Sequence, residues 1–457
     1  MSFKYESIEE LVSYSKEAEG KYLIDIDTKD IIGKTNKGSV GAVIEQSYFG
    51  YSANSKAEAD FADVGIELKT TGVIRQKRGT IAAKERLVLN IINYMDEVGR
   101  DFATSSFWSK NNKLLIFFYT YVRDSNGKPD YSKFQILKTI LHEFSEKDLE
   151  IIRQDWDLIH NKIKLGLAHE LSEGDTQILG ACTKGASKKS MREQPFSSIP
   201  AKQRAYSLKQ GYMTALVKQY IDHEKLIPIT NVKELKYKTV EEIIKEKFAQ
   251  YIGKTELEII KLLNLKESNA KNNAQLLTSG ILGITGTKLD KIEEFSKLNI
   301  KFKTVTYEKT GILKESMSFE NLNFQDIYLN DWETSELKMK FESTQFLFVI
   351  FQKNNENQKV LKGVKLWNVP LTILDNEIRE VYVEVKKLLA DGIVEWKEGN
   401  RYRNNLPKSG FNGVCHIRPK GQNRVKSMIV LPNGQELPNQ AFWFNAKFIK
   451  ELTLDIL

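Results

Sequence analysis

The chain has 457 residues, of which 28% are charged and 41% hydrophobic, and it carries a formal net charge of +8. This composition excludes a disordered chain, and the length exceeds what one ordinary core fills, so we expect at least two domains. Two distant cysteines exclude a disulfide framework, and the sequence has neither a signal-peptide pattern nor an apolar run of about 20 residues. We therefore expect a cytoplasmic protein without a membrane partner, whose basic excess favours a polyanion.

The first predicted elements lead to an acidic side chain. Residues 3–20 have the apolar spacing of an amphipathic helix, with Ile8, Leu11 and Val12 on one face. After a loop over 27–36, the run that starts at Gly38 predicts a helix opening that ends in the carboxylate of Glu45.

The next stretch, residues 57–71, places charged side chains at a spacing that suits chemistry. Residues 66–70 alternate apolar and polar, which predicts a half-buried strand with Glu67 and Lys69 on one face, roughly 7 Å apart. Asp60 lies seven residues earlier, before a predicted turn that can bring it back beside Glu67. Two carboxylates can hold Mg²⁺, and a neighbouring ammonium can orient water. On spacing alone, however, most matches to this pattern are a solvated strand face with an ion pair.

Three further segments follow in the same half. Residues 80–98 contain the run Lys84–Tyr94, and Lys110 precedes a predicted buried strand over 114–122. Residues 148–165 then carry the apolar stripe of a helix.

Several of these motifs resemble one known family. Glu45, Asp60, Glu67, Lys69 and Lys110 match the motif of MutH-type endonucleases, within the PD-(D/E)xK nuclease superfamily, and the runs 84–94, 166–174 and 202–209 resemble the Sau-type restriction branch. The resemblance implies a mixed α+β fold, with a mixed central sheet flanked by helices, and Mg²⁺-dependent hydrolysis of double-stranded DNA. It also implies that Asp60, Glu67 and Glu45 are metal ligands, and that Lys69 and Lys110 act on water and phosphate.

The segment 183–218 is strongly basic, with eight Lys or Arg residues against one acid. Interleaved serines and glycines let a backbone approach phosphates, so the segment predicts DNA contact, although a solvated basic loop is the alternative. The residues that we assign to DNA contact here are Lys184, Lys188, Lys189, Arg192, Lys202, Arg204, Ser207 and Lys209.

One position departs from the mismatch-repair members of the family. They carry a tyrosine linked to adenine-methylation sensing where this chain has Ser207. This difference favours the restriction branch, which cuts GATC regardless of adenine methylation.

The second half resembles a decayed copy of the first. Residues 226–245 predict a linker, so we expect a catalytic domain over 1–225 and a degenerate, DNA-binding or allosteric domain over 246–457. Lys301 stands where Glu67 stands in the first half, and Glu294 lies seven residues before it. The copy therefore cannot hold a divalent cation in the same way. Its basic residues persist, and we assign Arg418 and Lys420 to DNA contact.

These observations predict two tandem restriction-endonuclease-like lobes and a type II restriction endonuclease that cuts duplex DNA at GATC. The alternatives are a methylation-sensing nicking enzyme and a DNA-binding regulator that does not cut. We expect a monomer in solution. With one active site, it must nick each strand in turn or pair transiently with another chain on DNA, and the sequence leaves both open.

Overall fold

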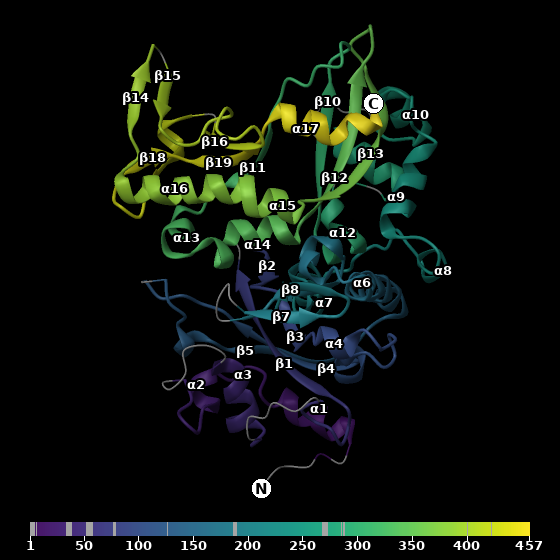
Figure 1. Ribbon diagram of the computed structural model, residues 1–457, viewed down its shortest axis with the longest axis vertical. Helices are drawn as coiled ribbons and strands as arrows, with labels where there is room; N and C mark the ends of the chain where they lie inside the picture. The colour runs from purple at the N-terminus through teal and green to yellow at the C-terminus, as the bar shows by residue number, and fades with distance from the viewer. Residues whose placement is uncertain are drawn as a thin grey trace. The chain divides into compact units, whose positions relative to one another are not determined.

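The computed structural model describes the chain except for residues 1–4, 6, 33–38, 52–57, 76–78, 126, 186–189, 267–272, 285, 287, 400 and 422. The chain forms two compact units. Unit 1 comprises Met1–Val240 together with Asp290–Asn299, and unit 2 comprises Glu241–Leu289 together with Ile300–Leu457 (Figure 1).

Unit 1 combines two sheets, a hairpin and surrounding helices. Its strands are β1 (Glu67–Arg75), β2 (Ile81–Ala83), β3 (Leu87–Ile91), β4 (Lys113–Thr120), β5 (Ile136–Glu143), β6 (Leu179–Thr183), β7 (Met191–Gln194), β8 (Ser197–Lys202) and β9 (Arg204–Leu208). Its helices include α1 (Ile8–Lys16), α2 (Leu23–Ile26), α3 (Ser39–Ala42), the π-helix η1 (Val43–Tyr48), α4 (Tyr94–Glu97), α5 (Ser106–Asn111), α6 (Glu146–Lys164), α7 (Gln210–Tyr220), α8 (Val232–Leu235) and α12 (Glu293–Lys297).

The larger sheet of unit 1 has the order β2-β1-β4-β5, and β1 runs parallel to β4 while the other pairs are antiparallel. Strand β4 is buried from Leu114 to Tyr119, because both faces of the sheet are covered. Burying each such side chain contributes about 1.5–3 kcal/mol. The mixed sheet flanked by helices confirms the predicted fold class.

Helix α6 shows why the sequence folds as predicted in this region. Ser145 caps its first turn by accepting a hydrogen bond from the Asp148 N–H (3.1 Å), and the residues of its apolar stripe are buried, including Ile152, Trp156 and Ile159. The predicted strands at 66–70 and 114–122 are confirmed as β1 and β4, whereas the predicted N-terminal helix is shorter, at Ile8–Lys16.

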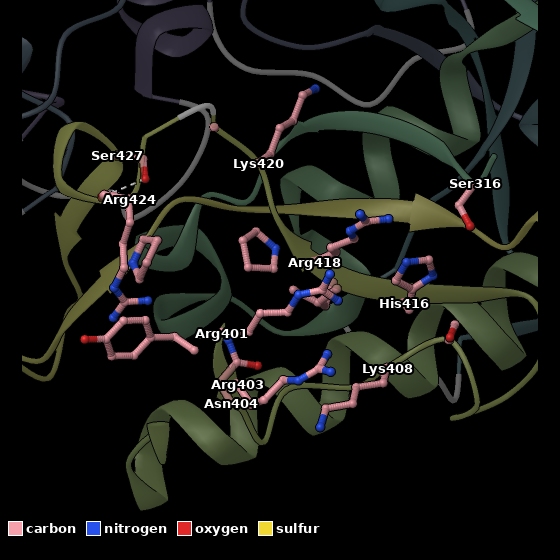
Figure 2. Close-up of a pocket in the computed structure, with 16 residues that line it drawn as sticks. Ser316, Arg401, Arg403, Asn404, Lys408, His416, Arg418, Lys420, Arg424 and Ser427 are labelled. Atoms are coloured by element: carbon pink, nitrogen blue, oxygen red, sulfur yellow. Dashed lines mark hydrogen bonds between the residues drawn. The ribbon is translucent and has the colours of Figure 1, made fainter. Parts of the chain in front are cut away.

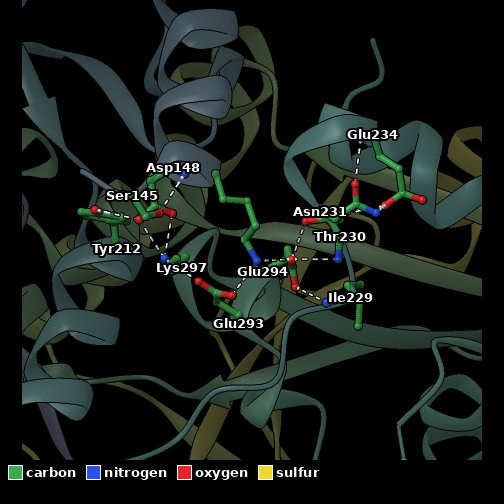
Figure 3. A network of polar contacts seen from close by, with 11 residues as sticks. Ser145, Asp148, Tyr212, Ile229, Thr230, Asn231, Glu234, Glu293, Glu294 and Lys297 are labelled. Carbon is green, nitrogen blue, oxygen red and sulfur yellow. Dashed lines mark hydrogen bonds and ion pairs between the residues drawn. The ribbon is translucent and has the colours of Figure 1, made fainter. Parts of the chain in front are cut away.

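A short segment from the second half of the sequence completes unit 1 (Figure 3). Lys297 of α12 donates to both carboxylate oxygens of Asp148 (2.7 and 2.8 Å) and lies 2.6 Å from Glu293. Glu294 accepts hydrogen bonds from the N–H groups of Ile229 and Thr230 (3.0 and 3.1 Å). We call residues 290–299 the strap.

The strap changes the interpretation of two sequence features. The predicted linker 226–245 is folded, since it contains α8 and its part up to Val240 belongs to unit 1. Glu294, which by its spacing corresponds to Asp60, has its carboxylate bound to Ile229, Thr230 and Lys147 of unit 1 instead of facing Lys301.

Unit 2 repeats the plan with three strands in place of four in the first sheet. Its strands are β10 (Ile300–Tyr307), β11 (Met317–Asn321), β12 (Gln345–Lys353), β13 (Lys359–Asn368), β14 (Glu395–Glu398), β15 (Arg401–Asn404), β16 (Cys415–Pro419), β17 (Met428–Val430), β18 (Glu436–Pro438) and β19 (Gln440–Phe444). Its helices include α9 (Val240–Ala249), α10 (Glu256–Leu262), α11 (Asn273–Ile281), α13 (Phe324–Leu329), α14 (Glu336–Ser343), α15 (Leu371–Ile373), α16 (Arg379–Asp391) and α17 (Ala446–Thr453).

The strand pairing shows that the second unit is a degenerate copy of the first. The order β10-β12-β13, with β10 parallel to β12, repeats β1-β4-β5, and β11-β19-β16 repeats β3-β9-β6. In register, Glu67 pairs with Leu114 and Lys301 pairs with Phe346. The two-lobe prediction is therefore confirmed.

Among the residues that the structure describes, no helix is both long and apolar enough to cross a bilayer.

Candidate active site

Strand β1 brings Glu67 and Lys69 to one face at the edge of the candidate site. The Lys69 ammonium donates to Glu67 Oε1 at 2.5 Å, and Lys110 Nζ lies 3.6 Å from the same oxygen. The Glu67 side chain is only 3% exposed, so its charge depends on these two cations rather than on water.

Asp60 folds back onto β1 as the turn predicts. Phe61 forms a β-bridge with Ile66, and the Asp60 N–H donates to Glu67 Oε2 (3.1 Å). In return, Asp60 Oδ2 accepts a hydrogen bond from the Leu68 N–H (3.0 Å). These reciprocal bonds hold the two carboxylates beside each other.

Glu45 and Lys110 reach the same place from two helices. Glu45 lies in η1, where burial raises its pKa first and the negative charges of Asp60 and Glu67 raise it further against Lys69. Lys110 lies in the last turn of α5, directly before β4. The structure therefore brings together all five residues of the predicted catalytic set.

The electrostatics of this cluster fit a cation. Burial raises the pKa of Glu67, and the neighbouring Asp60 adds to the rise, while Lys69 and Lys110 offset part of it. Carboxylates that are buried close together lose this penalty when a divalent ion lies between them.

The acidic groups do not form a complete metal cage. In the described part of the chain, no three His, Cys, Asp or Glu side chains make a group that could hold a metal ion as they stand. The fit is to the carboxylate pair Asp60 and Glu67, completed by water and substrate phosphate, as is usual for Mg²⁺.

The predicted DNA-contacting residues of unit 1 separate into exposed and buried groups. Lys184 and Arg192 are exposed and Lys202 is half-buried, around the β7–β8 hairpin. Lys188 and Lys189 lie outside the described residues.

The other three predicted contacts, Arg204, Ser207 and Lys209, have buried side chains with partners inside the protein. Arg204 donates to the Ala181 carbonyl (2.6 Å), and Lys209 donates to the Thr176 carbonyl. Arg204 and Ser207 lie in β9, the central strand of the β3-β9-β6 sheet, and Lys209 directly follows it, so these side chains are held inside the protein.

Ser207 has a neighbour that the sequence did not indicate. Its hydroxyl lies 3.3 Å from Glu173 Oε1, and Glu173 also forms an ion pair with Arg86. Both Ser207 and Glu173 are buried, so this position faces the protein and not solvent.

Unit 2 contains a basic groove of about 710 Å³ (Figure 2). Arg418 and Lys420, both predicted to contact DNA, line it, and Arg418 lies 5.2 Å from the centre of the Trp443 ring. Sequence reasoning missed Arg401 and Arg403 of β15, which also line it. Arg401 and Arg403 flank Tyr402, and alternate residues of a strand point to the same face, so the sequence could have indicated a basic strand face here.

Comparison with known proteins agrees with this architecture. The family model for the DNA mismatch repair enzyme MutH matches residues 49–155 and 286–379, one segment in each half of the chain. The type II restriction enzyme Sau3AI of Staphylococcus aureus is 34% identical over 97% of each chain.

Mismatch-repair relatives match a smaller part. The DNA mismatch repair proteins MutH of Serratia proteamaculans and Shewanella woodyi are 27% and 29% identical, over 41% of this chain and 79% of their own lengths. Because the similarity to the restriction enzyme extends over both units, the chain belongs to the MutH-related family of type II restriction endonucleases.

Proposed function

We propose that unit 1 hydrolyses both strands of duplex DNA at GATC with Mg²⁺, whether or not the adenine is methylated. The observation that carries this proposal is the convergence of Asp60 and Glu67 with Lys69, supported by Glu45 and Lys110. GATC itself rests on the family resemblance.

The carboxylates of Asp60 and Glu67 would hold the metal ion, with Glu45 close enough to act through water. Bound there, Mg²⁺ would polarise the scissile phosphate and make water more acidic. This pair is preorganised, because backbone N–H groups fix one oxygen of each carboxylate before substrate arrives.

The two ammoniums act on the substrate. Lys69 lies on the face of β1 that carries Glu67, where it orients the attacking water and stabilises charge in the transition state. Lys110 approaches from the end of α5 and would contact the scissile phosphate.

Indifference to methylation is supported by the surroundings of Ser207. At the position where the mismatch-repair branch has its tyrosine, this chain has a short, buried hydroxyl beside Glu173. A short, buried hydroxyl would offer an adenine methyl group less contact than the larger tyrosine side chain.

Unit 2 is proposed to bind a DNA segment without cutting it. Its groove is lined by five Arg or Lys side chains outside the degenerate site, namely Arg401, Arg403, Lys408, Arg418 and Arg424. Positive side chains of this kind, with an arginine stacked on tryptophan, suit a phosphate backbone.

Digestion of methylated and unmethylated plasmids, with Mg²⁺ or with chelator, tests the proposal. We expect linear product from both plasmids with Mg²⁺ and no product with chelator. Nicking confined to unmethylated DNA would instead support the mismatch-repair type of activity, and binding without cutting would support a regulator.

A further inference from the structure

Unit 2 contains a group of lysines where unit 1 has its candidate metal site. We call the group formed by Lys301, Lys303, Lys340 and Lys420 the lysine cluster. Lys301 and Lys303 of β10 stand in the register positions that Glu67 and Lys69 hold in β1. The charge at the Lys110 position is also reversed, since Glu342 stands four residues before Phe346, as Lys110 stands before Leu114.

Three ammoniums of the cluster meet successive residues of one strand. Lys303 donates to the Ser318 carbonyl (2.7 Å) and lies 4.5 Å from the centre of the Phe319 ring. Lys420 donates to the Phe319 carbonyl, and Lys340 forms an ion pair with Glu320. Successive strand residues are about 3.4 Å apart, so β11 gathers these three charges within a small region.

The cluster carries more positive than negative charge. Burial, followed by the positive charges of Lys301, Lys303 and Lys420, lowers the pKa of Lys340 to about 8. Burial, followed by Lys420, also lowers the pKa of Lys303 to about 8. Two carboxylates stand against these four ammoniums: Glu342, which is buried at the position of Lys110, and Glu320, which is 78% exposed, so that its charge is well screened by water.

The cluster adjoins the basic groove. Lys420 belongs to both, and Figure 2 shows its side chain extending away from Arg401 and Arg403. A polyanion lying in the groove would therefore have the cluster at one border of its path.

We propose that the lysine cluster is a phosphate-binding site in which ammoniums replace the metal ion of unit 1, so that unit 2 grips a DNA backbone phosphate without a divalent cation. A phosphate offers several acceptor oxygens to ammoniums from three directions, which suits β10, α14 and the end of β16 as donors. This inference rests on the proposal that unit 2 binds DNA.

Protection of lysines from acetylation tests the site directly. The full chain carrying Glu67→Ala is pulsed with an amine-acetylating reagent in chelator, and modification of each lysine is measured by mass spectrometry. The probes are duplex DNA containing GATC and, separately, inorganic phosphate. Lys447, which is 84% exposed and lies ten residues before Leu457, reports any general slowing of acetylation by the probe.

We expect DNA at ten times its Kd to slow acetylation of Lys303 and Lys340 about tenfold relative to Lys447, because protection follows 1 + [L]/Kd. Protection by inorganic phosphate alone would overturn DNA as the source of the phosphate. No protection by either probe would overturn the site.

A matched pair of substitutions gives a second readout. Lys301→Glu should weaken DNA binding in chelator about tenfold, whereas Lys314→Glu, on an exposed residue paired with Glu308, should change it far less. Equal effects would overturn the proposal. Plasmid cleavage by the unsubstituted chain with Mg²⁺ tests the proposed function separately, and arginine-directed labelling of Arg418 shows whether DNA still occupies the groove.

Discussion

Glu67 and Lys301 occupy the same register position in the parallel strand pairs of their units, opposite Leu114 and Phe346 respectively. One position thus carries a carboxylate in the unit with the candidate metal site and an ammonium in its copy. The exchange leaves the strand pairing intact, because the backbone register of the parallel pair is the same in both units, although Glu67 is buried and Lys301 is exposed. The two units consequently share a fold but not a chemistry.

Replacing Glu67 by Ala should reduce cleavage at least a hundredfold and leave DNA binding nearly unchanged, because a buried carboxylate beside Lys69 is lost from the proposed metal site. Plasmid cleavage and binding in chelator measure the two effects. Lys113→Gln is the control, since Lys113 begins β4 but pairs with Glu143 (3.0 Å). Retained cutting by the Glu67 variant would refute the assignment.

Adding Lys301→Glu to the Glu67→Ala chain should not restore cutting. The second carboxylate of the copy, Glu294, is held by the N–H groups of Ile229 and Thr230 and by Lys147, so unit 2 would have one acid where unit 1 has a pair. Plasmid digestion with Mg²⁺ measures the outcome. Recovered cleavage would mean that a single carboxylate suffices.

Lys297→Met should destabilise unit 1 by about 3–5 kcal/mol, because the buried carboxylate of Asp148 would lose its ammonium partner. Hydrogen exchange in peptides covering α6 and the strap reports the local loss. Lys245→Met is the comparison, since its pair with Glu241 is exposed and contributes less than about 1 kcal/mol. Similar exchange in both variants would contradict the role of the strap.

Acid should weaken unit 1 through His142. Burial lowers the pKa of this imidazole from 6.5 to about 4, Asp148 and Glu143 oppose the shift, and Lys297 adds to it. Between these two values the unfolded chain binds a proton that the folded protein does not, so stability is complete above pH 6.5 and falls toward pH 4. The loss amounts to as much as about 3 kcal/mol.

Urea unfolding between pH 7 and pH 4 measures how steeply the free energy of unfolding falls with pH, and His142→Gln should make this fall less steep. His223→Asn is a suitable control, because His223 is exposed and has a positive φ of 51°, which asparagine tolerates. An unchanged slope in the His142 variant would assign the acid sensitivity to other groups.

Arg418→Ala should weaken DNA binding in chelator. It should also reduce by about 1 the steepness with which the logarithm of the binding constant falls with the logarithm of the salt concentration, as expected for one lost phosphate contact. Arg424→Ala should have a smaller effect, because Arg424 is already held by both oxygens of Glu395 (3.1 and 2.7 Å). Titrations at several salt concentrations compare the two variants. A larger effect at Arg424 would contradict this ranking.

The candidate site could be predicted where its geometry is local. Glu67 and Lys69 share a face because alternate residues of any strand do, and the turn before them brings Asp60 back. Helix α6 was equally accessible, since its apolar stripe and its first-turn cap are both sequence features.

The partners of Arg204, Lys209 and Glu294 depend on contacts between residues that are far apart in the sequence. The sequence suggested that Arg204 and Lys209 are surface cations, but Arg204 lies in the central strand of a sheet and Lys209 directly follows that strand, and both donate to buried carbonyls. The destination of Glu294 was hidden for the same reason, because its partners lie about 65 residues earlier or more. No local pattern records such pairings.

The strap also has a consequence for how such a chain can evolve. Ten residues encoded after the apparent boundary at Val240 supply part of the interior of the first unit, including the ammonium that neutralises Asp148. A genetic exchange at that boundary would leave Asp148 without the ammonium of Lys297 in one recombinant, and it would leave α12 without its binding site in the other. Dividing the chain at Val240 would therefore take from the first unit a segment that its interior needs.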